Sequence, residues 1–189
     1  MHSVGGSPWR ATEDASRDVL VALYLRDALG IIDPSGLPRL LGTGLPAVPP
    51  PEDDLVTWAW TRWWVSVIEP DSNMPALPDA AADRWQPALR RHLDDARTFA
   101  SVAHDDYSIR MMERLMADGG DLILTELVAE REAELGRQAV AFELRIEILP
   151  LTAAGIWWIA DSAVAVDERL REDLTSYREA LRPIVERLA

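Results

Sequence analysis

The chain has 189 residues, of which 48% are hydrophobic and 27% are charged, proportions that fit an ordinary globular protein of one domain. Its formal net charge of −13 argues against nucleic-acid binding, because a phosphate backbone is bound by Lys and Arg side chains that replace its counterions. The chain has no cysteine, which excludes disulfides, thiolate chemistry and every zinc site that uses sulfur.

The start of the chain predicts a tail followed by one domain. Residues 1–11 contain Gly and Ser without apolar periodicity and are predicted to be a flexible tail, with residues 12–189 forming a single globular domain. The tail lacks the basic start and apolar run of a signal peptide. The longest apolar stretch, residues 148–160, is interrupted by Pro150 and Gly155 and is shorter than the ~20 residues of a membrane helix. We therefore expect a cytoplasmic protein that binds no membrane, and the use of arginine for all 19 basic residues suggests a GC-rich bacterial genome.

The first helix is predicted to begin near Thr12. Thr12 is a suitable N-cap, and the charges of Glu13 and Asp14 suit the positive end of a helix. Residues 19–25 are apolar on every side, which indicates a helix at the centre of the core or, alternatively, a buried strand. Gly30 is typical of the residue that follows a helix, so we predict that the helix ends just before it.

A proline-rich segment follows the first helix. Residues 31–51 contain six prolines and are predicted to form an irregular loop with extended stretches. A structureless loop of this length is uncommon inside a compact domain. We therefore expect it to pack across the surface and to be anchored by Leu37, Leu40 and Leu41.

The next segment is rich in tryptophan. Residues 55–68 are predicted to form a helix, with a strand as the alternative, since Thr, Val and Trp also favour strands. On a helix, one face carries Val56, Trp60, Trp63, Trp64 and Val67. Trp58 and Val65 lie on the opposite face, and Arg62 follows Trp58 by four residues, so that its guanidinium can stack on the indole.

Three helices are predicted in the middle of the chain. The first covers about residues 84–103, where apolar residues recur at helical spacing. Asp105 or Asp106 is predicted to cap a second, short helix that is rich in methionine and ends at a Gly-Gly pair. The third covers about residues 121–135 and ends at a glycine.

The periodicity changes from helical to alternating in residues 139–167. One clean alternation of apolar and polar residues is followed by two short apolar runs, which indicates an antiparallel meander. Residues 170–188 carry apolar residues at spacings of four and three, typical of a helix that packs on another surface, and Pro183 is expected to kink it. The predicted fold class is α+β: mainly helical, with a small antiparallel three-stranded sheet near the C-terminus and a C-terminal helix packed on it.

The densest polar group in the sequence is the run His104, Asp105 and Asp106. An imidazole beside carboxylates suits acid–base catalysis or a divalent cation. Asp is also a preferred helix cap, and the sequence supplies no third and fourth ligand nearby, so capping is the favoured interpretation. We predict no metal site and no cofactor.

The tryptophans are the other candidate functional residues. Indole rings combine a large apolar area with one N–H group, and they recur at interfaces and in ligand pockets as well as in cores. Adjacent residues on a strand point to opposite faces, so only one of Trp157 and Trp158 can face the core. The candidate residues for binding a ligand or partner are Trp58, Trp60, Trp63, Trp64, Trp157 and Trp158.

Three functions follow as hypotheses, in order of preference. The first is an interaction or accessory module that self-associates as a homodimer or docks on a protein partner, since the chain has more indole surface than a small core needs. The second is a binder of a small apolar ligand in a pocket between the sheet and Trp60 and Trp64. The third is an enzyme that uses His104, Asp105 and Asp106.

Overall fold

The computed structural model describes residues 9–33, 35–52, 54–68, 82–118 and 122–189. Helices and strands are mixed along the chain, and no helix in the described ranges has the length and hydropathy needed to cross a lipid bilayer. In chain order, the elements are β1 (Arg10–Asp14), α1 (Arg17–Ala28), α2 (Asp54–Ile68), α3 (Ala82–Asp118), α4 (Ile123–Leu135), β2 (Glu143–Leu149), β3 (Ile156–Ala160), β4 (Ala163–Asp167), α5 (Glu168–Glu172) and α6 (Leu174–Leu188).

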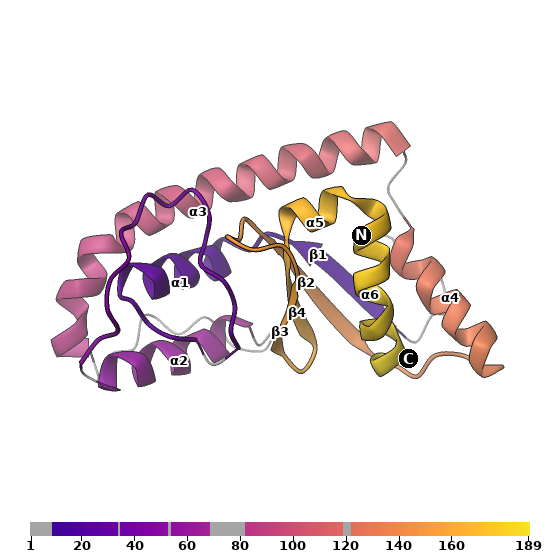
Figure 1. Ribbon diagram of the computed structural model, residues 1–189, viewed down its shortest axis with the longest axis horizontal. Helices are drawn as coiled ribbons and strands as arrows, with labels where there is room; N and C mark the ends of the chain where they lie inside the picture. The colour runs from indigo at the N-terminus through magenta and orange to yellow at the C-terminus, as the bar shows by residue number, and fades with distance from the viewer. Residues whose placement is uncertain (1–8, 34, 53, 69–81, 119–121) are drawn as a thin grey trace.

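The sheet has four strands in the order β1-β2-β4-β3 (Figure 1). β1 pairs with β2 in parallel, β2 pairs with β4 in parallel, and only β3 runs antiparallel to its neighbour β4. The prediction of a three-stranded antiparallel sheet is therefore wrong, although its three strands exist. The fourth strand comes from the beginning of the chain, where Arg10 pairs with Glu143 and Asp14 with Glu147.

The prediction of a helix starting at Thr12 is wrong, because this residue lies in the middle of β1. Exposure alternates along the strand, and the residues that face inward are Ala11 and Glu13. Neither is a large apolar side chain, so the alternation is invisible in a hydropathy pattern. Arg10 and Ala11, placed in the predicted tail, also belong to this strand.

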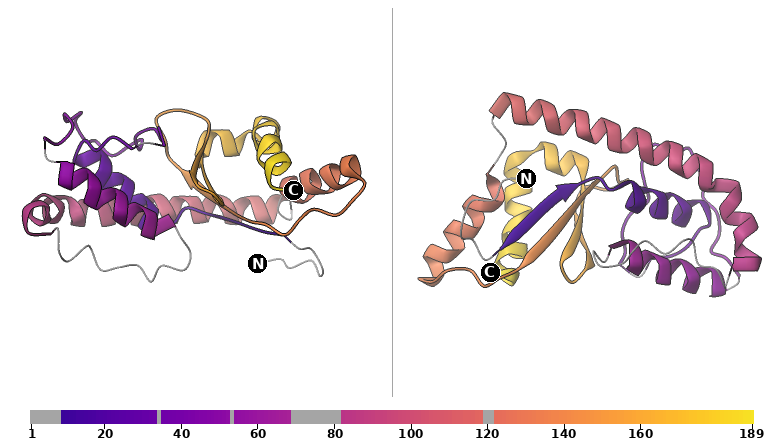
Figure 2. Two further views of the ribbon diagram at one scale, coloured as in Figure 1. Left: turned by 90° about the horizontal axis from the view of Figure 1, so that it is seen from below. Right: turned by 180° about the vertical axis from the view of Figure 1, so that it is seen from behind.

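The helix α1 lies at the centre of one half of the molecule, between α2 and α3 (Figures 1 and 2). This position explains why its middle is apolar on every side, and it confirms the prediction of a core helix. Tyr24 packs against Phe99 of α3 with ring centroids 5.5 Å apart. The helix ends at Ala28 with Leu29 as its C-cap, and Gly30 follows with a φ of 67°, in the position predicted for it.

A buried ion pair on α1 holds the proline-rich loop. Arg26 and Asp27 are 2% and 4% exposed, and the guanidinium donates to the carbonyl oxygens of Leu37 and Pro38 at 3.0 and 2.7 Å. The Asp27 carboxylate accepts from the backbone N–H of Leu40 at 2.7 Å. The loop is therefore fixed by polar contacts as well as by Leu37 and Leu40, which are buried as predicted. The prediction of Leu41 as a third anchor is wrong, because its side chain is 46% exposed.

The helix α3 is continuous over 37 residues, or about 55 Å, and runs along the length of the molecule (Figure 1). The prediction of a break near Asp105 and Asp106 is wrong. Both side chains are exposed and neither caps a helix, since Asp105 instead pairs with Arg17 of α1 at 2.8 Å. The Gly-Gly pair predicted to end this helix lies outside the described residues.

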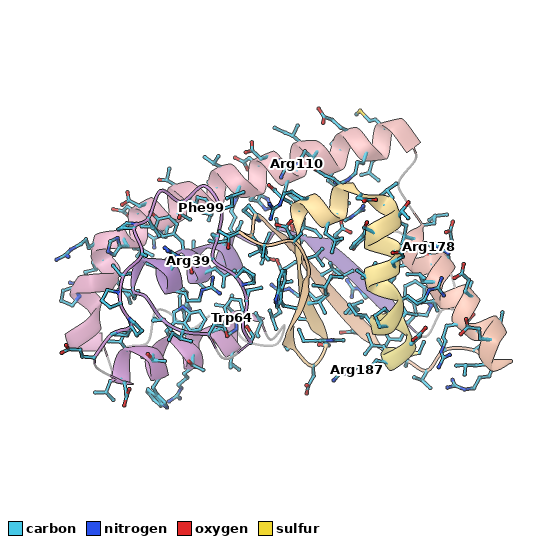
Figure 3. The ribbon with its side chains drawn as sticks, viewed as in Figure 1. Arg39, Trp64, Phe99, Arg110, Arg178 and Arg187 are labelled. Carbon is cyan, nitrogen blue, oxygen red and sulfur yellow. The ribbon has the colours of Figure 1, made fainter. Side chains whose placement is uncertain are left out.

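The helix α6 lies beside both the sheet and α4 (Figure 3). The Arg187 guanidinium covers the ring of Trp158 on β3, 4.4 Å from its centroid. Towards α4, Arg178 pairs with Glu126 at 2.7 Å and also with Glu130. Pro183 lies inside α6 without dividing it into two elements.

Candidate interaction surface

Three of the four tryptophans of α2 belong to the core. Trp60, Trp63 and Trp64 are 5% exposed or less. Trp60 stacks on Trp64 with ring centroids 5.4 Å apart, and its indole N–H donates to the carbonyl of Ala22 on α1 at 2.9 Å. These contacts join α2 to α1, and they give Trp60 and Trp64 a packing role.

The fourth tryptophan of α2, Trp58, lies on the outside. It is 55% exposed, and the Arg62 guanidinium lies over its ring at 5.6 Å from the centroid. Leu55 and Val65, one helical turn or two away on the same face, are also exposed. The division of α2 into two faces and the stacking of Arg62 on Trp58 are both as predicted from helical spacing. We call Leu55, Trp58, Arg62 and Val65 the outer face of α2.

The adjacent pair Trp157 and Trp158 is divided between the two faces of the sheet, as alternation along β3 requires. Trp157 is paired in register with Ala165, and Trp158 with Val164. Both indoles are half-buried, and Trp158 is covered by Arg187. The pair therefore contributes packing on both sides of an edge strand.

The run His104, Asp105 and Asp106 does not converge on one point. His104 approaches the carbonyl oxygen of Ala15 at 2.8 Å through Nδ1, which must carry the proton because a carbonyl only accepts. Asp105 is engaged with Arg17. Within the described ranges, no group of three His, Asp or Glu side chains lies close enough to hold a metal ion.

A polar cluster that the sequence did not predict surrounds Glu13 of β1. Its carboxylate accepts from Arg171 of α5, from the hydroxyls of Tyr107 of α3 and Tyr177 of α6, and lies 3.8 Å from Arg114 of α3. Burial and the Glu13 charge raise the pKa of Tyr107, which keeps the phenol protonated as a donor. The groups come from β1, from α3 and from the consecutive helices α5 and α6, so no local sequence motif predicts the cluster.

A second buried carboxylate, Glu147 of β2, is completely covered by protein. Its oxygens accept from the backbone N–H and the hydroxyl of Ser16 at 2.9 and 2.7 Å, and from Arg145. Burial raises the pKa of Glu147, while Arg145 and Ser16 act in the opposite direction. Since Ser16 precedes the first turn of α1, Glu147 ties the sheet to that helix.

The polar clusters therefore link elements of the fold, whereas the apolar side chains of the outer face of α2 are exposed in the part of the chain that the structure describes. An extensive exposed apolar surface is a common mark of an interaction site. No family model, no curated protein and no solved structure matches the chain.

Proposed function

We propose that the protein is a self-associating interaction module, in which the outer face of α2 packs against α2 of a second copy. The observation that carries this proposal is the exposure of Trp58 at the centre of that face. Tryptophan is the residue most enriched at the energetic centre of protein interfaces, since its ring buries a large area and loses little conformational freedom.

The residues of this face are arranged symmetrically along the helix. Leu55 and Val65 each lie five positions from Trp60, and Trp58 and Arg62 each lie two positions from it. Two copies of α2 that cross antiparallel about a two-fold axis near position 60 bring Trp58 of one against Arg62 of the other. Each copy then supplies a cation and an aromatic face to its partner, as an isologous interface requires.

The size of this face predicts a weak dimer. A stable interface buries about 800 Å² on each partner, which is more than a few side chains of a single helix provide. We therefore expect a dissociation constant on the order of 10–100 µM. Concentration then determines whether the protein is a monomer or a dimer.

The other two hypotheses lack comparable support from the described residues. Trp60 and Trp64 cover each other's ring faces, and the Trp60 N–H already has an acceptor, so these two residues do not favour an apolar-ligand pocket. His104 and Asp105 are engaged with groups on different residues, which gives no support to a shared catalytic role.

Sedimentation-velocity ultracentrifugation, run from low micromolar to several hundred micromolar protein, tests the proposal. We expect the wild type to shift from monomer to dimer over this range, and Trp58→Ser to stay monomeric. Val140→Ser is the matched control, since Val140 is 53% exposed on a loop away from α2. This variant should dimerise as the wild type does. A wild type that stays monomeric, or a Trp58→Ser variant that dimerises equally well, contradicts the proposal.

A further inference from the structure

A second exposed apolar surface lies on the C-terminal half of α3. It comprises four residues spaced seven, three and four positions apart, which is the spacing of a single helical face. All four are more than half exposed. We call these residues the α3 stripe: Val102, Ile109, Met112 and Met116.

The orientation of this part of α3 is fixed by the opposite side of the helix. Tyr107 is buried and donates to Glu13 of β1. Arg110 pairs with Glu168 of α5 at 2.6 Å, on the side of the helix that faces the sheet (Figure 3). These contacts hold the inner side of the helix against β1 and α5, so that the stripe faces solvent.

Charge is segregated around the same helix. The basic residues of this stretch, Arg110 and Arg114, turn inward towards Glu168 and Glu13. Asp105 is exposed at the helical position between Val102 and Ile109, within the stripe, and it is paired with Arg17. The exposed side chains of Asp106 and Glu113 lie along one edge of the stripe and form its acidic border. The stripe is therefore an apolar surface with an acidic border, on a chain whose net charge is −13.

We propose that the α3 stripe is a docking site for a basic amphipathic helix of another protein. The apolar side chains of such a helix cover the stripe while its Lys or Arg residues reach the acidic border. Two of the four stripe residues are methionines, whose flexible side chains adapt to apolar partners of different shape. From Val102 to Met116 the stripe extends about 21 Å, which a partner helix of four turns matches.

The carboxylates of Asp106 and Glu113, which form the acidic border, do not favour other occupants of the stripe. A second copy of the chain placed on the stripe brings Asp106 and Glu113 against the same residues of its partner, which repel. Nucleic acid and anionic lipid surfaces are repelled for the same reason. A basic protein segment is the occupant whose charge complements this surface.

The probe for this site is a synthetic amphipathic helix of about 18 residues, with Leu on one face and Lys on the others, titrated by fluorescence anisotropy. We expect Ile109→Ser with Met112→Ser to weaken its binding about tenfold, because two central apolar contacts are lost while every charge is kept. Val140→Ser, an exposed apolar residue outside both surfaces, should bind as the wild type does. Circular dichroism and thermal melting of each variant confirm that the fold is retained.

A scrambled peptide of the same composition separates docking from simple charge attraction, since it keeps the charge and loses the apolar face. Equal affinity for the two peptides, or equal affinity of the double serine variant and the wild type, overturns the proposal. The result does not depend on self-association: we expect Trp58→Ser to bind the peptide normally, because the stripe and the outer face of α2 lie on different helices.

Discussion

Arg171 of α5 donates from Nε to both carboxylate oxygens of Glu13 on β1, at 2.9 and 2.8 Å, although 158 residues separate the two in sequence. The same guanidinium lies over the ring of Tyr177 on α6, 4.7 Å from the centroid. Because β1 is an edge strand with one hydrogen-bonded neighbour, these side-chain contacts supply much of what attaches it to the rest of the molecule.

Removal of the Glu13 carboxylate should therefore destabilise the protein strongly. Glu13→Ala removes the carboxylate to which Arg171, Tyr107 and Tyr177 all donate, and we expect a loss of about 3 kcal/mol in the free energy of unfolding, measured by urea denaturation. Asp94→Ala is the control, since Asp94 pairs with Arg97 at an exposed position. It should leave the unfolding midpoint unchanged, and equal effects of the two variants would contradict the role given to Glu13.

Glycine is required at position 30 for two separable reasons. Its φ of 67° disfavours a side chain, and a Cβ there would lie 2.5 Å from the carbonyl oxygen of Pro49. Gly36 has a similar φ of 68° with nothing within 4 Å of its Cβ position. We expect Gly36→Ala to cost about 1 kcal/mol and Gly30→Ala about 3 kcal/mol in thermal or urea unfolding. Equal costs would show that the loop moves aside at Pro49.

The stability of the protein should fall as the pH rises through the native pKa of Glu147. Burial raises this pKa above its value in the unfolded chain, so between the two values the native state binds more protons than the unfolded state. In that window the free energy of unfolding decreases with rising pH, and the stabilising effect of the proton is lost above the native pKa. Burial also raises the pKa of Asp27 and that of Glu168, so these two carboxyl groups contribute to the same decrease of stability with rising pH.

Urea denaturation of Glu147→Gln from about pH 4.5 to pH 8 isolates this contribution, because the amide cannot ionise. We expect a shallower decrease of stability with pH than in the wild type. Glu179→Gln removes the same charge from an exposed position of α6 and should keep the wild-type slope. A Glu147→Gln slope identical to that of the wild type would mean that Glu147 does not titrate differently in the folded state.

Added salt should have opposite effects on the affinity of dimerisation through α2 and on the affinity of peptide binding at the α3 stripe. Two copies of a chain with a net charge of −13 repel, so added NaCl should strengthen dimerisation through α2. Docking of a basic helix on the α3 stripe relies on attraction and should weaken under the same conditions. Sedimentation and peptide titration at low and at near-molar NaCl measure both trends, and a parallel response would show that one of the two assignments is incorrect.

The sequence predicted those features that depend on local spacing. The two faces of α2 follow from the positions of Trp58, Trp60 and Arg62, and the core position of α1 follows from its apolar run. β1 was missed because its inward residues are Ala11 and Glu13, which carry no hydropathy signal. The continuity of α3 was missed because Asp at a helix start and exposed Asp within a helix look alike in sequence.

The candidate surfaces, like the fold, were only partly predictable from the sequence. All six tryptophans were predicted as candidates, and their spacing placed Trp58 opposite Trp60 and Trp64 without showing which of the two faces of α2 is buried. The α3 stripe was not predicted, since its methionines read equally well as core residues. The Glu13 cluster could not be predicted, because it joins residues from four elements through tertiary packing alone.

The parallel pairing of β1 with β2 constrains the order of folding during synthesis. Arg10 has no strand to join until Glu143 has been translated, by which time α1, α2, α3 and α4 have all been made. The backbone hydrogen bonds of each helix are local, so α1, α2 and α3 can form early, whereas closing the sheet requires a long chain loop and is slow. The sheet is therefore completed only when the final third of the polypeptide leaves the ribosome, and a nascent chain stalled before that point should be sensitive to proteases at its first strand.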